Sequence, residues 1–486
     1  MTNTLIVSVL IVYFLTLVGI SYFTSRKADN STFFLGERKS PWYVVSIGMI
    51  GASLSGVTFL SVPGWVGNEA SQFSYMQIVF GYFVGYIVIS YVLLPLYYRL
   101  NLTSIYEYLE GRFGFWSYKT GAFFFLGSRI LGASIRLLLV ASVLQSILFE
   151  SWNVPFEVTV IISVALIWVY TNRGGIKTIV WTDTIQTTFM ILAVILSIVY
   201  INKSLDWSML EFFSSSELKE YNKIFVTDNF LERNFFWKSF VGGAFVTICM
   251  TGLDQDMMQK NLTCKNIVEA KKNMIVFSFI LTFVTFLFIL LGALLYIYAK
   301  RNNIDVPLMN GSMNSDLLFP KIALEGGLGQ FVGITFILGL IAAAYSSADS
   351  ALTSLTTSFC IDILKINKLS SESQIKVRKQ THIWMSLTLI LVVISYRYIL
   401  DRNVIDSLLT VAQYTYGPLL GLFAFGIFTK FKIDDKKVYY VVIINMILII
   451  ILGNIPSSLI GGYFIGYELL PINGLLNFIG LYLIRK

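Results

Sequence analysis

Long apolar stretches recur along the whole chain and constrain its fold more than any other feature. A helix needs about 20 predominantly apolar residues to cross a hydrocarbon core of about 30 Å. We count thirteen such stretches, with approximate bounds 4–24, 42–67, 73–98, 117–148, 154–171, 177–202, 236–257, 270–298, 326–357, 380–399, 404–428, 437–454 and 466–484. Of the 486 residues 56% are hydrophobic, more than a water-soluble fold of this size could bury. The sequence therefore predicts an all-α polytopic membrane protein with thirteen transmembrane helices.

The positively charged residues indicate how the chain crosses the membrane, because Lys and Arg favour cytoplasmic loops. They cluster in alternate connections such as 365–379 and 430–437, whereas the connections near 68–72, 149–153 and 455–465 contain none. We expect a multi-pass protein of the cell inner (plasma) membrane, with its N-terminus outside and its C-terminus in the cytoplasm. The net charge of +8 is then an orientation signal. The bilayer is the expected partner, and neither nucleic acid nor an obligate protein partner is expected.

Cysteine and histidine usage excludes several kinds of site. Cys249, Cys264 and Cys360 have no paired spacing, so we expect free thiols. A single histidine, His382, excludes a His-rich metal site. The sequence shows no catalytic constellation and no phosphate-binding glycine loop, which argues against an enzyme.

Two of the apolar stretches are interrupted by glycines. Residues 46–58 combine three glycines with several hydroxyl side chains, and residues 242–252 carry three more glycines. Small residues also mediate close helix packing in membranes, which would explain the pattern without a ligand. The alternative is an unwound segment whose free carbonyls bind an ion, and interrupted helices in corresponding places of two halves are typical of a transporter site.

The ninth stretch carries a polar face. Ser346, Asp349, Ser350 and Thr353 share one side of a helix, as oxygen ligands of a hard cation such as sodium would. A packing face whose hydroxyls bond to their own backbone remains the alternative. Asp183, about two turns into the sixth stretch, is a stronger candidate, because acids within a membrane are usually functional. Its alternative is a residue wetted from the cytoplasmic side.

Two arginines lie in the long fourth stretch. Arg129 and Arg136 are seven residues apart, so both lie on one stripe of the helix. An arginine at this depth pairs with an acid or with an anionic ligand. The sequence leaves both possibilities open.

Five motifs together resemble the sodium/solute symporter family. They lie at 95–114, 174–186, 254–260, 346–350 and 417–421. They occur in the family's order, and the resemblance covers about residues 30–430. It implies a LeuT-type fold of two inverted five-helix repeats in a single transporter domain, 1–486. The parts of that domain would be an extra helix at 4–24, repeats at 42–202 and 236–428, and two further helices at 437–484.

The resemblance also implies sodium as the bound ion, and no other cofactor. The ligands it assigns to a first sodium site are Gly51, Leu54, Ala343, Ser346 and Ser347. Members that bind sialic acid hold a second sodium with an aspartate that matches Asp183. Here Asp349 stands where those members have a hydroxyl, so the second set becomes Asp183, Asp349 and Ser350.

The solute pocket is predicted from the same resemblance. Residues 53–58 look like the branch that carries monocarboxylates, iodide and sialic acid, whose sialic-acid members bind the carboxylate with an arginine near Arg129, and Arg136 competes for that role. Sugar carriers place a glutamine where Thr410 stands here, with Gln413 one turn later, which argues against a plain hexose. The predicted pocket residues are Ser53, Ser55, Thr58, Tyr75, Gln77, Arg129, Arg136 and Gln413.

These observations predict sodium-coupled symport of a small organic solute by alternating access, with an anion such as sialic acid or another carboxylate favoured. Sodium- or proton-coupled uptake of a neutral sugar, polyol or amino acid is the alternative. A transporter-like membrane sensor is less favoured, because the sequence shows no soluble signalling domain.

Overall fold

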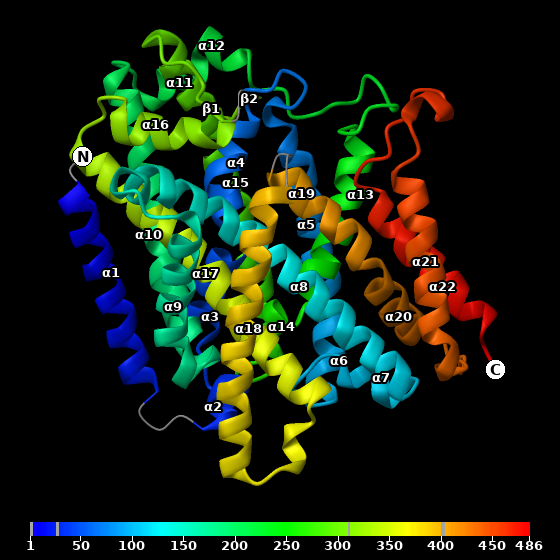
Figure 1. Cartoon of the computed structure of the whole chain (residues 1–486). Coiled ribbons are helices and arrows are strands. Elements are labelled where there is room, and N and C mark those ends of the chain that lie inside the picture. Colours follow the sequence, from blue (N-terminus) through cyan, green and yellow to red (C-terminus); the bar gives the residue numbers. More distant parts are fainter. Residues whose placement is uncertain (1–2, 26–28, 310–311, 400–403) are drawn as a thin grey trace.

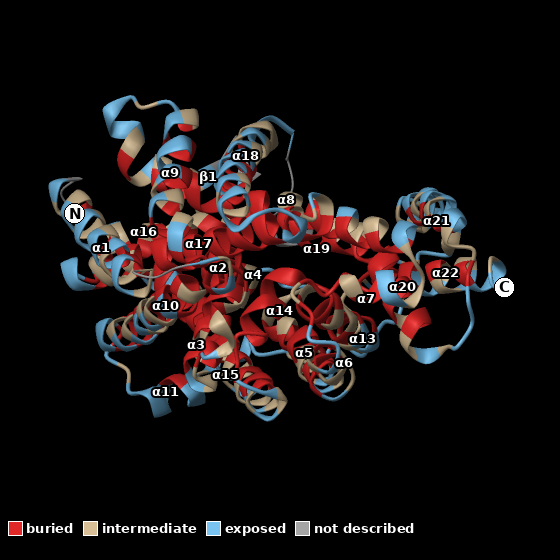
Figure 2. Cartoon of the chain, turned by 90° about the horizontal axis from the view of Figure 1, so that it is seen from below, coloured by how far each residue is buried: buried red, intermediate tan, exposed pale blue. Residues whose placement is uncertain are grey.

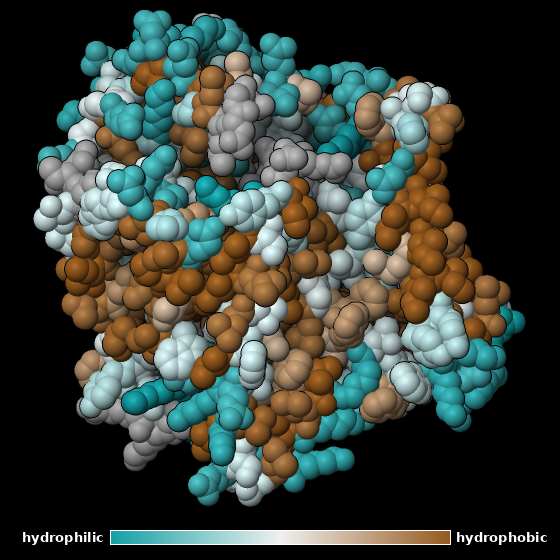
Figure 3. All heavy atoms as spheres, in the orientation of Figure 1, coloured by the Kyte–Doolittle hydropathy of each residue, from teal (hydrophilic) through white to brown (hydrophobic). Residues whose placement is uncertain are grey.

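The computed structural model describes residues 3–25, 29–309, 312–399 and 404–486. Helices make up most of this part of the chain, and its strands form one antiparallel hairpin, β1 (Leu308–Met309) with β2 (Ser312–Met313). Among the described residues nine helices are long and apolar enough to cross a membrane, and three bent pairs raise the number of spans to as many as twelve. Apolar side chains form a belt around the middle of the molecule, between two polar ends (Figure 3). The predicted helical membrane protein is confirmed.

The first half of the chain forms the following elements. They are α1 (Asn3–Thr24), α2 (Asn30–Leu35), η1 (Gly36–Arg38), α3 (Trp42–Ser53), α4 (Gly56–Trp65), η2 (Gln72–Ser74), α5 (Tyr75–Val88), η3 (Ile89–Leu93), α6 (Leu94–Arg99), α7 (Glu107–Arg112), α8 (Phe115–Leu144), η4 (Gln145–Phe149), η5 (Glu150–Trp152), α9 (Phe156–Gly174), α10 (Ile176–Ser204), α11 (Met209–Ser214) and α12 (Ser216–Lys219).

The second half of the chain is also built mainly of helices. Its helices are α13 (Phe236–Thr247), η6 (Ile248–Gly252), α14 (Gln255–Asn261), α15 (Ile267–Arg301), η7 (Ser315–Leu317), α16 (Leu318–Glu325), α17 (Gln330–Ser358), η8 (Phe359–Ile363), η9 (Ile366–Lys368), α18 (Ser371–Ile399), α19 (Val404–Thr415), α20 (Gly417–Phe428), η10 (Asp435–Lys437), α21 (Val438–Gly453), η11 (Ser457–Ile460) and α22 (Leu469–Leu483). Each apolar stretch of the sequence falls on one of these helices or on a bent pair, and the thirteenth, α22, has only 15 residues.

The two ends of the bundle carry different connections. The N-terminus, α11, α12, α16 and the hairpin lie at one end, which we call the N face (Figure 1). The C-terminus, α2, α6 and α7 lie toward the opposite end, the C face (Figure 1).

Three spans are bent where the local sequence breaks the helix. Helices α3 and α4 meet at 58°, and between them Leu54 (φ −83°, ψ 80°) leaves the helical conformation and Ser55 is extended. The α13–η6 segment and α14 meet at 68° at Asp254, whose side chain accepts a hydrogen bond from the Asp256 backbone and so caps α14. Helices α19 and α20 meet at 43°, and Pro418 in the first turn of α20 favours a helix start there.

The helices at the centre pack closely through small residues. Helix α17 lies against α10, and all of its residues from 340 to 358 are buried. A β-carbon on Gly339 would lie 2.6 Å from the Ala193 β-carbon, and one on Gly48 of α3 would lie 3.1 Å from the Val180 carbonyl oxygen. Small residues permit this backbone approach. Seen from the C face, the buried residues of α3, α14 and α17 form the middle of the molecule (Figure 2).

Candidate functional site

Oxygen atoms from α10 and α17 converge on the first broken helix. A β-carbon on Gly51 would lie 2.3 Å from the Thr187 hydroxyl, 3.0 Å from the Ser346 hydroxyl and 3.5 Å from the Asp183 carbonyl oxygen. Glycine leaves room there for those oxygens to face the end of α3. The close contact at Gly51 therefore serves an oxygen cluster, and not only the packing of apolar side chains.

Several oxygens of this cluster have no hydrogen-bond partner. The hydroxyls of Thr187, Ser346 and Ser347 are buried and unpartnered within the described part of the chain. Buried polar atoms are nearly always paired, so such a group calls for a ligand. Leu54 lies in the adjacent break, and Ala343 lies one turn before Ser347 on α17. The predicted first sodium ligands thus lie on the two elements that meet here.

The described residues contain no group of three or more His, Cys, Asp or Glu side chains that could hold a metal ion. A cation at the first break would therefore be bound by hydroxyl and carbonyl oxygens, which suit a hard ion of low charge.

The acids predicted for a second sodium site are close to an ammonium group. Lys260 of α14 donates to the Asp183 carboxylate at 2.5 Å, and the Ser350 hydroxyl donates to the same oxygen at 3.3 Å. Asp349 accepts a hydrogen bond from the Tyr170 hydroxyl at 2.8 Å. Both carboxylates are fully buried, and each keeps one oxygen without a partner among the described residues. An ion bound here would have to share Asp183 with Lys260.

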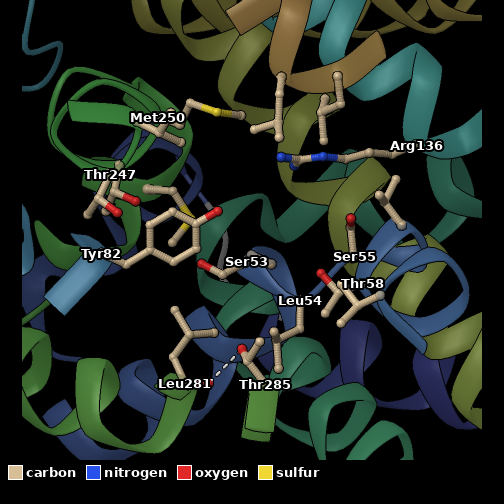
Figure 4. A pocket seen from close by; sticks show the side chains of 18 of the residues that line it. Ser53, Leu54, Ser55, Thr58, Tyr82, Arg136, Thr247, Met250, Leu281 and Thr285 are labelled. Atoms are coloured by element: carbon tan, nitrogen blue, oxygen red, sulfur yellow. Dashed lines mark hydrogen bonds between the residues drawn. The ribbon is translucent and has the colours of Figure 1, made fainter. Parts of the chain in front are cut away.

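A cavity of about 100 Å³ lies beside the first break. Six of the predicted pocket residues line it: Ser53, Ser55, Thr58, Tyr75, Arg129 and Arg136. The Arg136 side chain points into this space, with Tyr82 and Met250 on one side and Ser55 and Thr58 on the other (Figure 4).

The structure distinguishes the two arginines. Arg129 is paired with the Asp256 carboxylate and lies 3.9 Å from Asp254, which also accepts a hydrogen bond from Tyr416 at 2.5 Å. Arg136 is buried and makes no hydrogen bond or ion pair with any described residue. Arg129 thus has internal acids, whereas Arg136 has no ion-pair partner among the described residues.

Two predicted pocket residues lie elsewhere. The Gln77 amide donates to the Asn234 carbonyl at 2.9 Å and accepts from the Val226 backbone at 3.0 Å, so it anchors the loop after α12. Gln413 is buried but does not line the cavity, and its backbone carbonyl accepts a hydrogen bond from the side chain of Asn473 of α22. These contacts join segments that are distant in the sequence, so the position of either glutamine in the sequence does not reveal them.

Sequence reasoning missed several residues of this region. Thr187 lies four residues after Asp183, so helical spacing alone could have placed it on the same face. Lys260 was noticed in a motif, but nothing in the sequence pointed to Asp183 as its partner. Thr247 and Thr285 line the cavity from α13 and α15 and carried no signal beyond their polarity.

The second broken helix is closed by hydrogen bonds. The Tyr97 hydroxyl donates to the Gly252 carbonyl at 2.8 Å, and the Tyr106 hydroxyl donates to the Leu253 carbonyl at 2.9 Å. The Gln255 side chain donates to the Thr103 carbonyl at 2.8 Å and accepts from the backbone of the residue at 105 at 3.0 Å. The motif at 95–114 therefore clamps this break.

A second cavity, of about 890 Å³, opens toward the N face. Gly64 and Trp65 at the end of α4 line it, together with Asn68, Asn234 and Tyr296. Helix α4 also lines the inner cavity with Thr58 and residue 62, so one half-helix runs from one cavity to the other.

Comparisons with known proteins identify the family of this chain. The family model described as "Sodium:solute symporter family" matches residues 33–460. The sodium/sialic acid symporter NanT of Aliivibrio fischeri is 27% identical over 427 residues, covering 85% of this chain and 80% of that protein. The human sodium-coupled monocarboxylate transporter 1 is 25% identical over 425 residues, covering 85% of this chain and 67% of that protein.

Two solved structures share the fold. One is the substrate-bound outward-open state of a Na+-coupled sialic acid symporter, with a TM-score of 0.83 and 21% identity over 99% of this chain and 98% of that one. The other is the nucleobase-cation-symport-1 family transporter Mhp1 in a closed conformation, with a TM-score of 0.58 and 12% identity over 94% of each chain. The family match covers most of the sequence, and the first of these folds covers nearly all of it. The chain belongs to the sodium:solute symporter family.

Proposed function

We propose that this chain takes up a small carboxylate together with sodium by alternating access, and that Arg136 binds the carboxylate. Membership of the family makes the chain a sodium-coupled symporter of a small solute. The relatives named above carry sialic acid or monocarboxylates, which are anions. The proposal concerns the solute and the residues that bind it.

The observation that carries the proposal is that the buried Arg136 guanidinium makes no hydrogen bond or ion pair with any residue that the structure describes. A buried charge is costly unless a counter-charge reaches it. Of the two acids near the cavity, Asp256 pairs with Arg129 and Asp254 lies 3.9 Å from Arg129, and neither forms an ion pair with Arg136. A carboxylate fits the remaining guanidinium, because two parallel hydrogen bonds match its geometry.

The cavity volume favours a short carboxylate over a bulky sugar acid. A cavity of about 150 Å³ accommodates one benzene molecule. At about 100 Å³, the cavity beside Arg136 suits a carboxylate with a few carbon atoms. Val57, Met250 and Leu281 would contact its apolar part. Sialic acid is the second candidate, supported by the relatives' names, and would require the cavity to widen.

For sodium we propose the first break, with ligands from Gly51, Leu54, Ala343, Ser346 and Ser347. Thr187 joins this set, because its hydroxyl also points at Gly51. The break presents backbone to this cluster and Ser53 and Ser55 to the solute cavity. Since one unwound segment contacts both ligands, binding either should raise the affinity for the other by the same factor.

A second sodium at Asp183, Asp349 and Ser350 would compete with the ammonium of Lys260. We therefore propose a single sodium at the first break as the principal coupling ion.

We also propose the arrangement that the sequence suggested: thirteen spans in one transporter domain, with repeats at 42–202 and 236–428. The N face would lie outside the cell and the C face in the cytoplasm, as the loop charges indicate. Solute would then enter through the cavity at Trp65 and reach Arg136 along α4.

The test is uptake by proteoliposomes. Wild-type protein receives labelled lactate, propionate, N-acetylneuraminate, glucose or alanine under a sodium or a choline gradient. We expect sodium-dependent uptake of a short carboxylate. Arg136→Gln should raise its KM by at least about 30-fold, the loss typical of a truncated buried charge pair, and should leave binding of ²²Na+ intact.

Arg301→Gln is the matched control, since Arg301 pairs with Glu217 at the N face and is partly exposed. Uptake of glucose or alanine but of no carboxylate would contradict the proposal. So would an Arg136→Gln protein with wild-type KM.

A further inference from the structure

The half-helix α14 lies between the solute cavity and the C face and is buried along its whole length. Every residue from Gln255 to Asn261 is buried. Met257 contributes to the cavity wall, and the residues that follow α14 pair with the segment before α3, where the Ser40 backbone donates to the Thr263 carbonyl. Movement of solute to the C face requires α14 to leave this position.

An ion-pair cluster holds the first turn of α14. Asp254 and Asp256 face Arg129 of α8, which pairs with Asp256 and lies 3.9 Å from Asp254. Arg129 also lines the solute cavity, as Arg136 does. The same guanidinium therefore borders the solute and holds α14. We call the Arg129–Asp256 pair the solute latch.

A second ion pair holds the last turn of α14. Lys260 donates to Asp183 of α10 at 2.5 Å, and its side chain is 1% exposed, so water does not screen the pair. The Asp183 backbone carbonyl faces Gly51 in the oxygen cluster, and Ser350, one turn after Ser346, donates to the Asp183 carboxylate. We call the Lys260–Asp183 pair the sodium latch.

The charge of each ligand opposes one latch. A sodium ion at Ser346 and Ser347 would attract the Asp183 carboxylate and repel the Lys260 ammonium. A carboxylate on Arg136 would attract Arg129 and repel Asp256. Residues three or four apart on a helix are about 5–6 Å from each other. At about 6 Å and an effective dielectric constant of about 20, one unit charge changes such an equilibrium by roughly 100-fold.

We propose that α14 is a double latch that responds to both ligands. Sodium loosens the Lys260–Asp183 pair, the carboxylate loosens the Arg129–Asp256 pair, and α14 moves away from the cavity only when both pairs are loosened. Each ligand alone leaves α14 held at its other end. This device prevents sodium from leaking without solute, and it rests on the proposed function for the identity of the two ligands.

A native cysteine reports the position of α14. Cys264 follows α14 directly, is fully buried, and its carbonyl accepts a hydrogen bond from the Tyr98 hydroxyl at 3.1 Å. Its alkylation requires α14 and the residues after it to move. Cys360, buried in η8, serves as an internal reference. The full-length protein in nanodiscs is treated with N-ethylmaleimide, and mass spectrometry gives the rate at each thiol.

In sodium or choline without solute, wild-type Cys264 should react slowly. Asp256→Asn opens the solute latch, so Cys264 should stay slow in choline and react at least about tenfold faster in sodium, within the range that one charge can produce. Lys260→Gln removes the sodium latch. In this variant the alkylation of Cys264 should be slow in sodium chloride and fast in choline lactate. The double variant should be fast in every salt.

Asp228→Asn is the matched control, because Asp228 forms an exposed ion pair with Lys223 at 2.6 Å, and it should behave as wild type. The proposal is overturned if Cys264 of the Asp256→Asn variant is already alkylated rapidly in choline. It is also overturned if that thiol reacts in sodium as slowly as it does in the wild type. If that variant does not fold, Arg129→Gln removes the same latch.

The alkylation experiment with Asp256→Asn in sodium contains no carboxylate, so its result separates the double latch from the proposed carboxylate substrate. A sodium response of Asp256→Asn together with failed carboxylate uptake would refute the proposed solute and leave the sodium latch standing. Carboxylate uptake without that response would refute the double latch alone. A Lys260→Gln protein that transports lactate but shows no response to choline lactate would refute the solute latch.

Discussion

The two broken helices at the centre of the molecule carry similar sequence signals and differ in their chemistry. At the break between α3 and α4, the hydroxyls of Thr187, Ser346 and Ser347 gather without hydrogen-bond partners among the described residues. At the break before α14, tyrosine hydroxyls already bond the carbonyls of Gly252 and Leu253. Both breaks interrupt a glycine-rich span, yet the carbonyls at the second are already bonded, and the carboxylate beside it, Asp256, is paired with Arg129.

The difference shows that an interrupted helix in a membrane is not by itself an ion site. Freed backbone groups must be satisfied in either case. At the first break the hydroxyls that face Gly51 have no partner among the described residues, as the proposed sodium site requires. The second is satisfied by side chains of the protein, so it fixes the position of α14. One break suits ligand binding, and the other suits mechanical control.

The largest expected effect comes from filling the space at Gly51. Gly51→Ala would place a β-carbon 2.3 Å from the Thr187 hydroxyl, and it should weaken ²²Na+ binding by more than about 100-fold, equivalent to about 2.8 kcal/mol. Gly252→Ala at the other break would meet the ends of the side chains at 93 and 89, so it should lower the melting temperature and leave sodium affinity unchanged. Gly19→Ala, with nothing within 4 Å, is the control. If Gly51→Ala binds sodium normally, the close approach at Gly51 serves helix packing and not sodium binding.

An acid outside the spans should make the stability of α4, the second half of the first broken helix, depend on pH. Asp316 in η7 lies beside Ser61 of α4, and burial raises its pKa to about 6. Above about pH 6 the folded protein bears the full cost of the buried carboxylate. As pH falls from about 6 toward 4, the folded carboxyl takes up a proton before the unfolded one does, so the free energy of unfolding rises by up to about 3 kcal/mol.

Asp316→Asn should abolish this pH dependence and raise the melting temperature at pH 7.5. Thermal unfolding between pH 4.5 and 7.5 measures both effects. If the Asp316→Asn variant keeps the wild-type pH profile, the pH dependence of stability comes from another group.

A smaller effect should follow from removing single hydroxyls at the first break. Ser346→Ala and Ser347→Ala should each raise the sodium dissociation constant by about tenfold, or about 1.4 kcal/mol. Without sodium the melting temperature should hardly change, because these hydroxyls have no hydrogen-bond partner to lose in the part of the chain that the structure describes. Sodium binding and melting are measured on the same samples. A large loss of stability without sodium would show that the hydroxyls serve the fold.

The smallest effect should come from the tyrosines at the second break. Tyr97→Phe and Tyr106→Phe each leave one carbonyl without its donor and should lower the free energy of unfolding by about 1 kcal/mol. Sodium affinity should stay at the wild-type value. Tyr43→Phe, at an exposed position, is the control. A fall in sodium affinity in Tyr106→Phe would give the second break a role in ion binding.

Most of the helical architecture could be predicted, because apolar length is a local property. The glycines near Gly51 and the hydroxyl face at Ser346 were also visible, since helical spacing alone places those residues together. Gln77 and Gln413 were assigned to the pocket by their place near it in the sequence. The Gln77 amide instead donates to the backbone of Asn234, 157 positions away, and the Gln413 backbone carbonyl accepts from the side chain of Asn473, 60 positions away.

The sequence by itself determined that this chain is a bundle of membrane helices, that two of its spans carry glycine-rich breaks, and which family it resembles. Those properties depend on residue type and short spacing. Only the tertiary structure decided that Arg129 is paired, that Arg136 has no ion-pair partner among the described residues, and that Lys260 binds Asp183. The two pairs join residues 127 and 77 positions apart. In a buried site a charge is defined by its partner, and helix packing, not the local sequence, brings the partner there.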